Sequence, residues 1–345
     1  KFIMAYTTIK KPSDYFNTVT YTGNTSAGHA ITGVGFQPDL TWNKSRANAT
    51  PHYLFDVIRG ATNFIKSDST SAESQNTDTL TSFDSDGFTL GNATGNNGSG
   101  SFASWNWLAN GAGSSNTDGD ITSTVSANTT SGFSIVSYTG NATSGATVGH
   151  GLGSTPKMII FKDRSNVNGW HTYHSSFANA TDLLLLDTTG ALYTANYYIN
   201  NTRPTSSVFS LGNGAGTNGS SENYIAYCFA EKQGYSKFGS YDGNSIGNDN
   251  NFQYCGFSPA FVMIKCSSAV ESWVMFDSKR NGFNPDNDEL YPNLSNAESS
   301  VESVDFLSNG FNPYKGTGTI NRSGKSYIYM AFAEQPLVGD NPATA

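Results

Sequence analysis

The sequence predicts an all-β protein built from three tandem β-sandwich units, of a jelly-roll or lectin-like kind, with few helices. Three observations lead to this prediction. A set of landmarks recurs three times along the chain, short apolar runs alternate with turn-forming residues, and no long stretch has the apolar period of a helix.

The repeat is defined by landmarks that keep their order and their spacing. Each copy opens with an aromatic-turn motif: Tyr21-Thr22-Gly23-Asn24, Tyr138-Thr139-Gly140-Asn141 and Tyr241-Asp242-Gly243-Asn244. A proline follows each tyrosine at a nearly constant distance (Pro38, Pro156, Pro259), and a lysine follows each proline at a fixed distance (Lys44, Lys162, Lys265). Each copy closes on an apolar run ending in Ala109, Ala230 or Ala333. Recurrence of this kind indicates one structural unit used three times.

The composition indicates strands joined by polar turns. Aromatic residues make up 13% of the chain and charged residues 13%, and there are 36 glycines. Runs such as Phe133-Ser134-Ile135-Val136-Ser137-Tyr138 alternate with a period near two, which is typical of a strand with one buried face. Asn-Gly, Asp-Gly and Ser-Gly pairs between the runs favour tight turns. A sandwich or jelly roll is the expected result.

The division of the chain follows from these turns and from shifts in composition. Residues 111–131 contain mostly Gly, Ser, Thr, Asn and Asp, which is typical of a linker or a long surface loop. The junction between the second and third units is short. We therefore expect these two units to pack together, in a one-plus-two arrangement with the first. The predicted parts are an N-terminal segment 1–14, unit 1 at 15–110, the linker 111–131, unit 2 at 132–234, unit 3 at 235–335 and an extended tail 336–345.

Charge and hydropathy narrow the possible partners. The net charge of −8 and the lack of clustered Lys and Arg argue against nucleic acid as a partner. No apolar run is long enough to insert in a membrane, and no basic-then-apolar signal peptide opens the sequence. We therefore expect a soluble protein that is not secreted by a signal peptide. The odd number of cysteines, all within apolar runs, favours buried free thiols at Cys228, Cys255 and Cys266.

The lysine of each unit is the most prominent polar repeat. An arginine follows two residues later in the first two units, and a tryptophan lies near each lysine in sequence. Carbohydrate sites combine aromatic faces with polar groups, so one interpretation is a ligand contact at a strand end. The other interpretation is a structural lysine that protects a strand edge. The candidate ligand-binding residues are Trp42, Lys44, Arg46, Lys162, Arg164, Trp170, Lys265 and Trp273.

The other candidates for chemistry have structural alternatives. His171 and His174 should lie on opposite faces of one strand, so we expect no zinc site, and the sequence carries no nucleophile elbow or phosphate loop. The acidic loops 116–120 and 284–289 have the oxygen density that calcium needs, but neither has the spacing of an EF-hand, and turn formation is the preferred explanation. Paired carboxylates of a glycosidase stay possible, yet Asp56 and Asp277 occupy equivalent positions in two units, which favours a structural role. We expect no catalytic residues, metal or cofactor.

Several motifs resemble a known group of proteins. Trp105-Asn106-Trp107-Leu108-Ala109-Asn110-Gly111, the following Asn116-Thr117-Asp118-Gly119-Asp120 and the run Gly132-Phe133-Ser134-Ile135-Val136-Ser137-Tyr138 are similar to a domain that recurs in virion proteins of marine bacteriophages, especially cyanophages. The C-terminal Tyr327-Ile328-Tyr329-Met330-Ala331-Phe332-Ala333 resembles the ends of those proteins. The resemblance extends over roughly Tyr15 to Ala345 and implies a place in a virion, without implying catalytic residues.

These observations give three hypotheses for function. The first is a non-enzymatic structural protein on the virion surface, a tail-fibre or receptor-binding component that contacts host surface glycans. The second is a capsid decoration protein, and the third is a carbohydrate-active enzyme. Other virion proteins are the expected partners, and we expect a homotrimer because fibre proteins commonly form symmetric assemblies of three chains.

Overall fold

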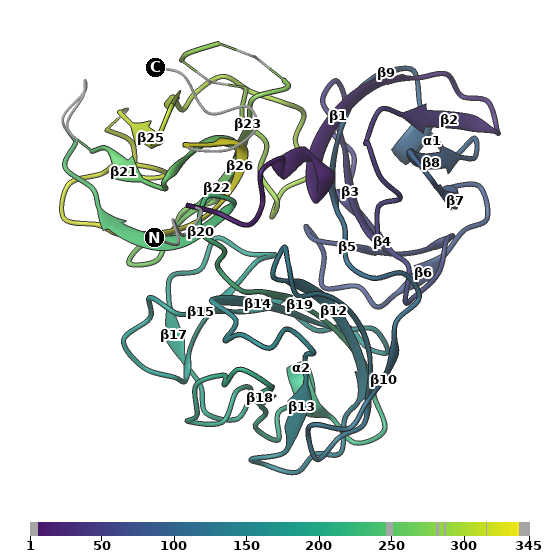
Figure 1. The fold of residues 1–345 in the computed structure, drawn as a ribbon, viewed down its shortest axis with the longest axis vertical. Coiled ribbons are helices and arrows are strands. Elements are labelled where there is room, and N and C mark those ends of the chain that lie inside the picture. The colour runs from purple at the N-terminus through teal and green to yellow at the C-terminus, as the bar shows by residue number, and fades with distance from the viewer. Residues whose placement is uncertain (1–5, 246–250, 281–282, 286–287, 315, 338–345) are drawn as a thin grey trace, which may run out of the picture.

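The computed structural model describes residues 6–245, 251–280, 283–285, 288–314 and 316–337, and it confirms the all-β class with few helices. The strands within each sheet pair antiparallel. The described residues form two α-helices, each about one turn long. Three main sheets surround a common centre, as Figure 1 shows. No helix in the described part of the chain is long and apolar enough to cross a membrane.

Main sheet 1 has the strand order β1-β9-β3-β4-β5-β6, and a smaller sheet, β2-β8-β7, covers its outer face. The elements of this part are η1 (Pro12–Asp14), β1 (Phe16–Gly23), β2 (His29–Thr32), β3 (Leu40–Ser45), β4 (Tyr53–Asp56), β5 (Asn63–Lys66), β6 (Ser74–Gln75), β7 (Leu80–Asp84), β8 (Gly87–Leu90), α1 (Thr94–Asn97) and β9 (Gly100–Trp107).

Main sheet 2 has the order β10-β11-β12-β19-β14-β15-β16-β17, and the pair β13-β18 covers its outer face. The elements are β10 (Ser114–Asn116), β11 (Ser123–Asn128), β12 (Phe133–Thr139), β13 (Thr147–Gly149), β14 (Met158–Asp163), β15 (His171–His174), β16 (Asp182–Leu185), β17 (Tyr193–Thr194), β18 (Val208–Ser210), α2 (Ala215–Asn218) and β19 (Asn223–Phe229).

Main sheet 3 has the order β20-β26-β22-β23, and the small sheet β21-β25-β24 covers it. The elements are β20 (Ser236–Asp242), β21 (Gln253–Tyr254), β22 (Phe257–Cys266), β23 (Trp273–Asp277), β24 (Val304–Leu307), β25 (Gly310–Pro313) and β26 (Ser326–Pro336). The same four-strand order therefore recurs, as β1-β9-β3-β4, β12-β19-β14-β15 and β20-β26-β22-β23.

The recurring aromatic-turn motif fastens each main sheet to the segment that precedes its last strand. The tyrosine hydroxyl donates to a backbone carbonyl there, and the asparagine backbone N–H donates to an asparagine side chain. The tyrosine bonds are Tyr21 to Asn96 O (2.8 Å), Tyr138 to Thr217 O (2.7 Å) and Tyr241 to Ile320 O (2.6 Å). The asparagine bonds are Asn24 to Asn97 (3.0 Å), Asn141 to Asn218 (2.8 Å) and Asn244 to Asn321 (3.0 Å).

The glycine of the motif is required by a close approach of two backbone segments. A Cβ on Gly23 would lie 1.9 Å from the carbonyl oxygen of Gly98, and Gly140 and Gly243 meet carbonyl oxygens at 2.3 and 2.2 Å. No side chain fits at such distances, so the motif keeps a residue without a Cβ.

Each main sheet is buried on both faces, which explains why its strands are continuous apolar runs. In β14, Ile159 and Phe161 point into the core under β13 and β18, whereas Met158 and Ile160 point to the centre of the molecule. This follows from the strand period of two. The inner faces of all three main sheets share one central core, in which Trp107, Phe229 and Phe332 pack against one another.

Two expectations about organisation are wrong. Segment 111–131 is not a linker, because β10 and β11 lie in it and pair with main sheet 2, where Ile121 and Val125 are buried. Its few apolar residues suffice because each one faces the core. The one-plus-two arrangement is also wrong, since residues of all three main sheets meet in the central core. The three cysteines are buried and free, which confirms the prediction.

Candidate functional site between the main sheets

The three repeated lysines lie at the contacts between main sheets, and none reaches solvent. Lys44, Lys162 and Lys265 are each 0% exposed. Lys44 Nζ donates to the carbonyls of Ser45 (2.7 Å) and Asn48 (3.2 Å). Burial lowers the pKa of each lysine to about 8.

The other two lysines donate hydrogen bonds both within their own sheet system and to a neighbouring one. Lys162 Nζ donates to Asn168 O (2.7 Å) and to Thr70 O (3.0 Å). Lys265 Nζ donates to Glu271 O (2.7 Å), Cys266 O (2.8 Å) and Thr189 O (3.2 Å). These ammonium groups replace solvent at loop carbonyls, so they are not available to a ligand, and the surface ligand contact predicted for them is wrong.

The tryptophans of the predicted site are buried as well. Trp170 Nε1 donates to Lys66 O (2.9 Å), and Trp273 Nε1 donates to Leu185 O (2.9 Å), so both rings join one main sheet to the next. Trp42 Nε1 donates to His52 Nδ1 (3.0 Å). The three tryptophans were predicted to form a ligand site with the nearby lysines. Their rings face the central core, however, where no sugar could stack on them.

The predicted arginine Arg46 belongs to an ionic network between main sheets 1 and 3, called here the 1–3 interface. Its guanidinium binds Glu298 (2.7 Å) and Asp288 (3.2 Å). Glu298 in turn binds Arg280 (3.0 Å), and Arg280 binds Asp277 (2.6 Å). The network closes back on main sheet 1, because Trp105 Nε1 donates to Asp277 Oδ2 (2.9 Å).

The 1–2 interface contains the same network with equivalent residues. Arg164 binds Glu73 (2.9 Å), Glu73 binds Arg59 (3.3 Å), and Arg59 binds Asp56 (2.5 Å). Tyr227 on main sheet 2 donates to Asp56 Oδ2 (2.8 Å), as Trp105 does to Asp277. Both aspartates are fully buried, and both networks link a repeated arginine to a repeated Asp-x-x-Arg pair.

At the 2–3 interface, the part of the chain that the structure describes does not form this network. Strand register places His174 opposite Met158, where the other sheets have Asp56 opposite Leu40 and Asp277 opposite Phe261. His174 is followed by Phe177 where Arg59 and Arg280 stand. His174 Nε2 lies 3.3 Å from Tyr329 O on main sheet 3, and burial lowers the pKa of this imidazole to about 4.

The outer positions of the network are replaced too. The backbone N–H of Glu298 donates to Arg46 O (2.9 Å), and that of Glu73 donates to Arg164 O (3.0 Å). At the 2–3 interface the equivalent bond runs from Leu192 N to Ser267 O (2.8 Å). Serine and leucine therefore stand where the other interfaces have an arginine and a glutamate.

A groove opens at this interface. It encloses about 290 Å³ and lies between β20 and β26 on one side and the segment after β15 on the other, elements that adjoin in Figure 1. Its lining consists of Ser176, Phe177, Ala178, Leu192, Ser240, Tyr241, Asp242, Ser267, Ser326, Tyr327 and Ile328. Phe177, Leu192 and Ser267 are the residues that replace the ionic network, so the groove is found where the network is lost.

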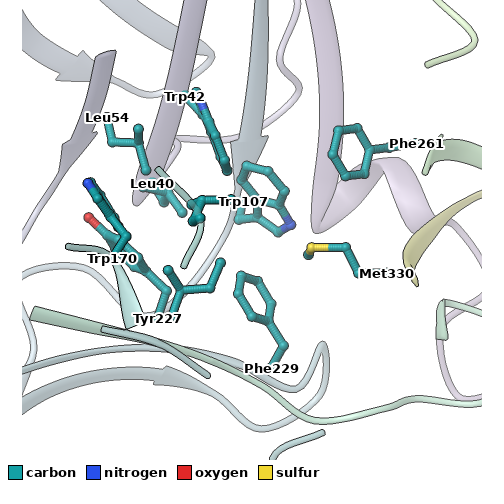
Figure 2. A pocket seen from close by; sticks show the side chains of 11 residues that line it. Leu40, Trp42, Leu54, Trp107, Trp170, Tyr227, Phe229, Phe261 and Met330 are labelled. Atoms are coloured by element: carbon teal, nitrogen blue, oxygen red, sulfur yellow. The ribbon is translucent and has the colours of Figure 1, made fainter. Parts of the chain in front are cut away.

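The space found at the centre of the molecule is much smaller. A cavity of about 10 Å³ lies between Trp107, Phe229 and Met330, whose side chains converge from different main sheets in Figure 2. Such a volume is at the limit for one water molecule, and an apolar lining offers water no partners. The central core is therefore a packing feature.

The remaining candidates have structural partners. His171 Nδ1 lies 2.8 Å from Tyr193 Oη, while His174 faces main sheet 3, so the two rings point to opposite sides of β15. Asp120 accepts bonds from the backbone and hydroxyl of Thr147 (3.0 and 2.8 Å). In the loop 284–289, Asp286 and Asn287 lie outside the described residues. Among the residues that the structure describes, no group of three His, Cys, Asp or Glu side chains could hold a metal ion.

The groove and the two networks were missed by reasoning from the sequence. A signal was present, since Asp56 to Arg59 and Asp277 to Arg280 share a spacing that becomes His174 to Phe177 in the second copy. The partners of the network, Glu73 and Glu298, carry no such signal, because they lie in irregular segments far from the strands they bind.

Comparison with known proteins gives one match. A family model described as a domain of unknown function, DUF7483, matches residues 11–336, which include all three main sheets. No curated protein and no solved structure matches the chain. The chain belongs to the DUF7483 family, whose function is unknown.

Proposed function

We propose that this protein is a non-enzymatic structural protein on the surface of a bacteriophage particle, and that it contacts glycans of the host cell. One observation is the main support for a non-enzymatic role. The polar side chains that recur between the sheets are buried and bound to one another or to backbone carbonyls, as in the Asp56–Arg59 and Asp277–Arg280 pairs. Recurring polar residues thus hold sheets together and leave the outer loops for contact.

The resemblance to cyanophage virion proteins supports the proposed location of the protein on a phage particle. It rests on the motif Trp105-Asn106-Trp107-Leu108-Ala109 and on the C-terminal strand, and both segments lie within β9 and β26 or directly after them. These strands form the interior of their main sheets, so the residues that carry the resemblance serve the fold and do not point to a particular ligand.

Cell binding tests the proposal. Fluorescently labelled full-length protein, incubated with marine cyanobacterial host cells, should bind them and should reduce adsorption of the phage that encodes it. A protein that neither binds nor competes contradicts the receptor-binding role. Release of reducing sugar from host envelope material, assayed in parallel, would contradict the non-enzymatic role.

A capsid decoration protein is the second candidate. Three main sheets close around one centre within a single chain (Figure 1), which gives a body suited to a site of threefold symmetry on a shell. Antibody labelling of intact virions separates the candidates, since label on the head favours decoration and label on the tail favours receptor binding. The expected homotrimer is tested by measuring the mass of the protein in solution.

A further inference from the structure

We propose that the groove at the 2–3 interface is the glycan-binding site and that it takes one neutral sugar residue. The inference rests on the proposed glycan contact and deepens it, because it names the site and the class of sugar.

The groove exists because bulky ionic side chains have been replaced. At the 1–3 and 1–2 interfaces, Arg46 and Arg164 each reach a glutamate of the neighbouring sheet system. At the 2–3 interface, Ser267 takes the arginine position while its backbone still bonds Leu192. The backbone contact is thus kept, and only the side chains that would fill the space are lost.

A carboxylate has been gained at the same place. Asp242 ends β20 opposite Ser326, and the equivalent residues on main sheets 1 and 2 are Thr22 and Thr139. Asp242 is exposed, and its Oδ1 accepts a hydrogen bond from Ser326 Oγ (2.8 Å). Among the described residues, Oδ2 takes part in no hydrogen bond that would occupy it, so it can accept from a ligand.

The lining fits a neutral sugar better than a charged ligand. Ser176, Ser240 and Ser326 are exposed and offer hydroxyls, and Asp242 offers a strong acceptor for sugar hydroxyls. Leu192, which is half-buried, supplies apolar surface for sugar C–H groups, and the buried side chains of Phe177 and Ile328 lie beneath it in the lining. Among the described residues that line the groove there is no lysine or arginine, so an anionic sugar would find a carboxylate there and no cation. The volume of about 290 Å³ lies at the lower end for small-ligand sites, which suits a single residue.

Binding of methyl glycosides tests the inference directly. Full-length protein should bind at least one of methyl glucoside, methyl galactoside or methyl mannoside, measured by saturation-transfer NMR and calorimetry, and should not bind glucuronate. D242T installs the threonine of the other sheets and should weaken binding roughly tenfold or more. S267R installs the arginine of the other interfaces and should abolish binding by filling the groove.

The controls separate this inference from the proposed function. D118T makes the same charge change in an exposed loop and should bind like the original protein. Far-ultraviolet circular dichroism and the unfolding midpoint confirm that each variant is folded. Sugar binding that persists in folded D242T and S267R, or no binding by any of the glycosides, overturns the inference. If the unmodified protein binds host cells and both variants bind equally well, the groove is not the site, although the receptor role stands.

Discussion

At the scale of single residues, each aspartate of the two ionic networks accepts several hydrogen bonds with its side chain, and Asp277 shows what these bonds do. Asp277 accepts from the backbone N–H groups of Lys279 (3.1 Å) and Arg280 (3.0 Å), from Arg280 Nε (2.6 Å) and from Trp105 Nε1 (2.9 Å). It therefore shapes its own turn, neutralises a buried cation and joins two main sheets. A buried pair of this kind is sensitive to the loss of one partner, because the other charge stays in a low-dielectric interior.

Removal of this carboxylate should be strongly destabilising. D277A leaves the buried Arg280 guanidinium without its nearest carboxylate, and we expect the free energy of unfolding to fall by about 3–5 kcal/mol. Urea unfolding measures the change. H174A, at the equivalent position, removes no charge partner and should cost less, so equal losses in the two variants would contradict this account.

The buried histidines make stability depend on pH. The pKa of His174 is about 4 in the folded protein, and burial lowers the pKa of His171 to about 3. An unfolded histidine titrates near about 6.5. As the pH falls from 7 to 5 the unfolded chain binds protons that the folded chain does not, so stability falls.

The free energy of unfolding, measured at pH 7 and pH 5, checks this prediction. We expect a smaller decrease for H174Q than for the unmodified protein, because glutamine does not titrate. Asp68 and Asp187 have pKa values raised by burial and act in the opposite direction nearer the ordinary carboxylate range. A decrease that is the same in both proteins would show that His174 makes no contribution.

At the scale of elements, β11 distinguishes main sheet 2 from the other two. β12 pairs with β11 on one side and β19 on the other, whereas the equivalent β1 and β20 are the end strands of their sheets. β11 buries Val125 in the core under β13 and β18, so a segment with a loop-like composition completes this sandwich. Its alternation of small polar residues with single apolar ones is enough for an added strand.

A proline in β11 should therefore destabilise the protein. Proline lacks the N–H needed for a sheet, and V125P also removes a buried side chain, so we expect a lower unfolding midpoint and faster amide exchange in β12. T117P, in the exposed turn between β10 and β11, should have little effect. A true linker would tolerate both changes equally.

At the scale of the whole molecule, the central core makes the three sheet systems depend on one another. Trp107, Phe229 and Phe332 come from different main sheets and contact one another, with ring centroids 5.7–6.3 Å apart. A sheet system taken alone would expose this apolar inner face to water, and the hydrophobic effect opposes that.

The full chain should consequently unfold in one cooperative transition. Calorimetry is the measurement, and a fragment of residues 132–234 should lack a cooperative transition because it loses both the central core and β11. Three resolved transitions, or a fragment as stable as the full chain, would indicate independent domains instead.

The sequence by itself determined the features that depend on neighbouring residues. The strand class follows from short alternating runs, and the burial of Cys228, Cys255 and Cys266 follows from the apolar runs that contain them. The aromatic-turn motif was visible as a repeat, although the structure was needed to show that Gly23 is held against Gly98 O.

Only the tertiary structure decided what lies between the sheets. Lys44 lies near the end of a strand, a position from which a lysine normally reaches water, but here it is fully buried and bonded to loop carbonyls. Segment 111–131 becomes strands because a paired partner and a core receive its few apolar side chains. The groove depends on Ser267 and Leu192, which are far apart in sequence. Contacts of this kind are set by how whole sheets pack, and local sequence patterns do not show which distant segments meet.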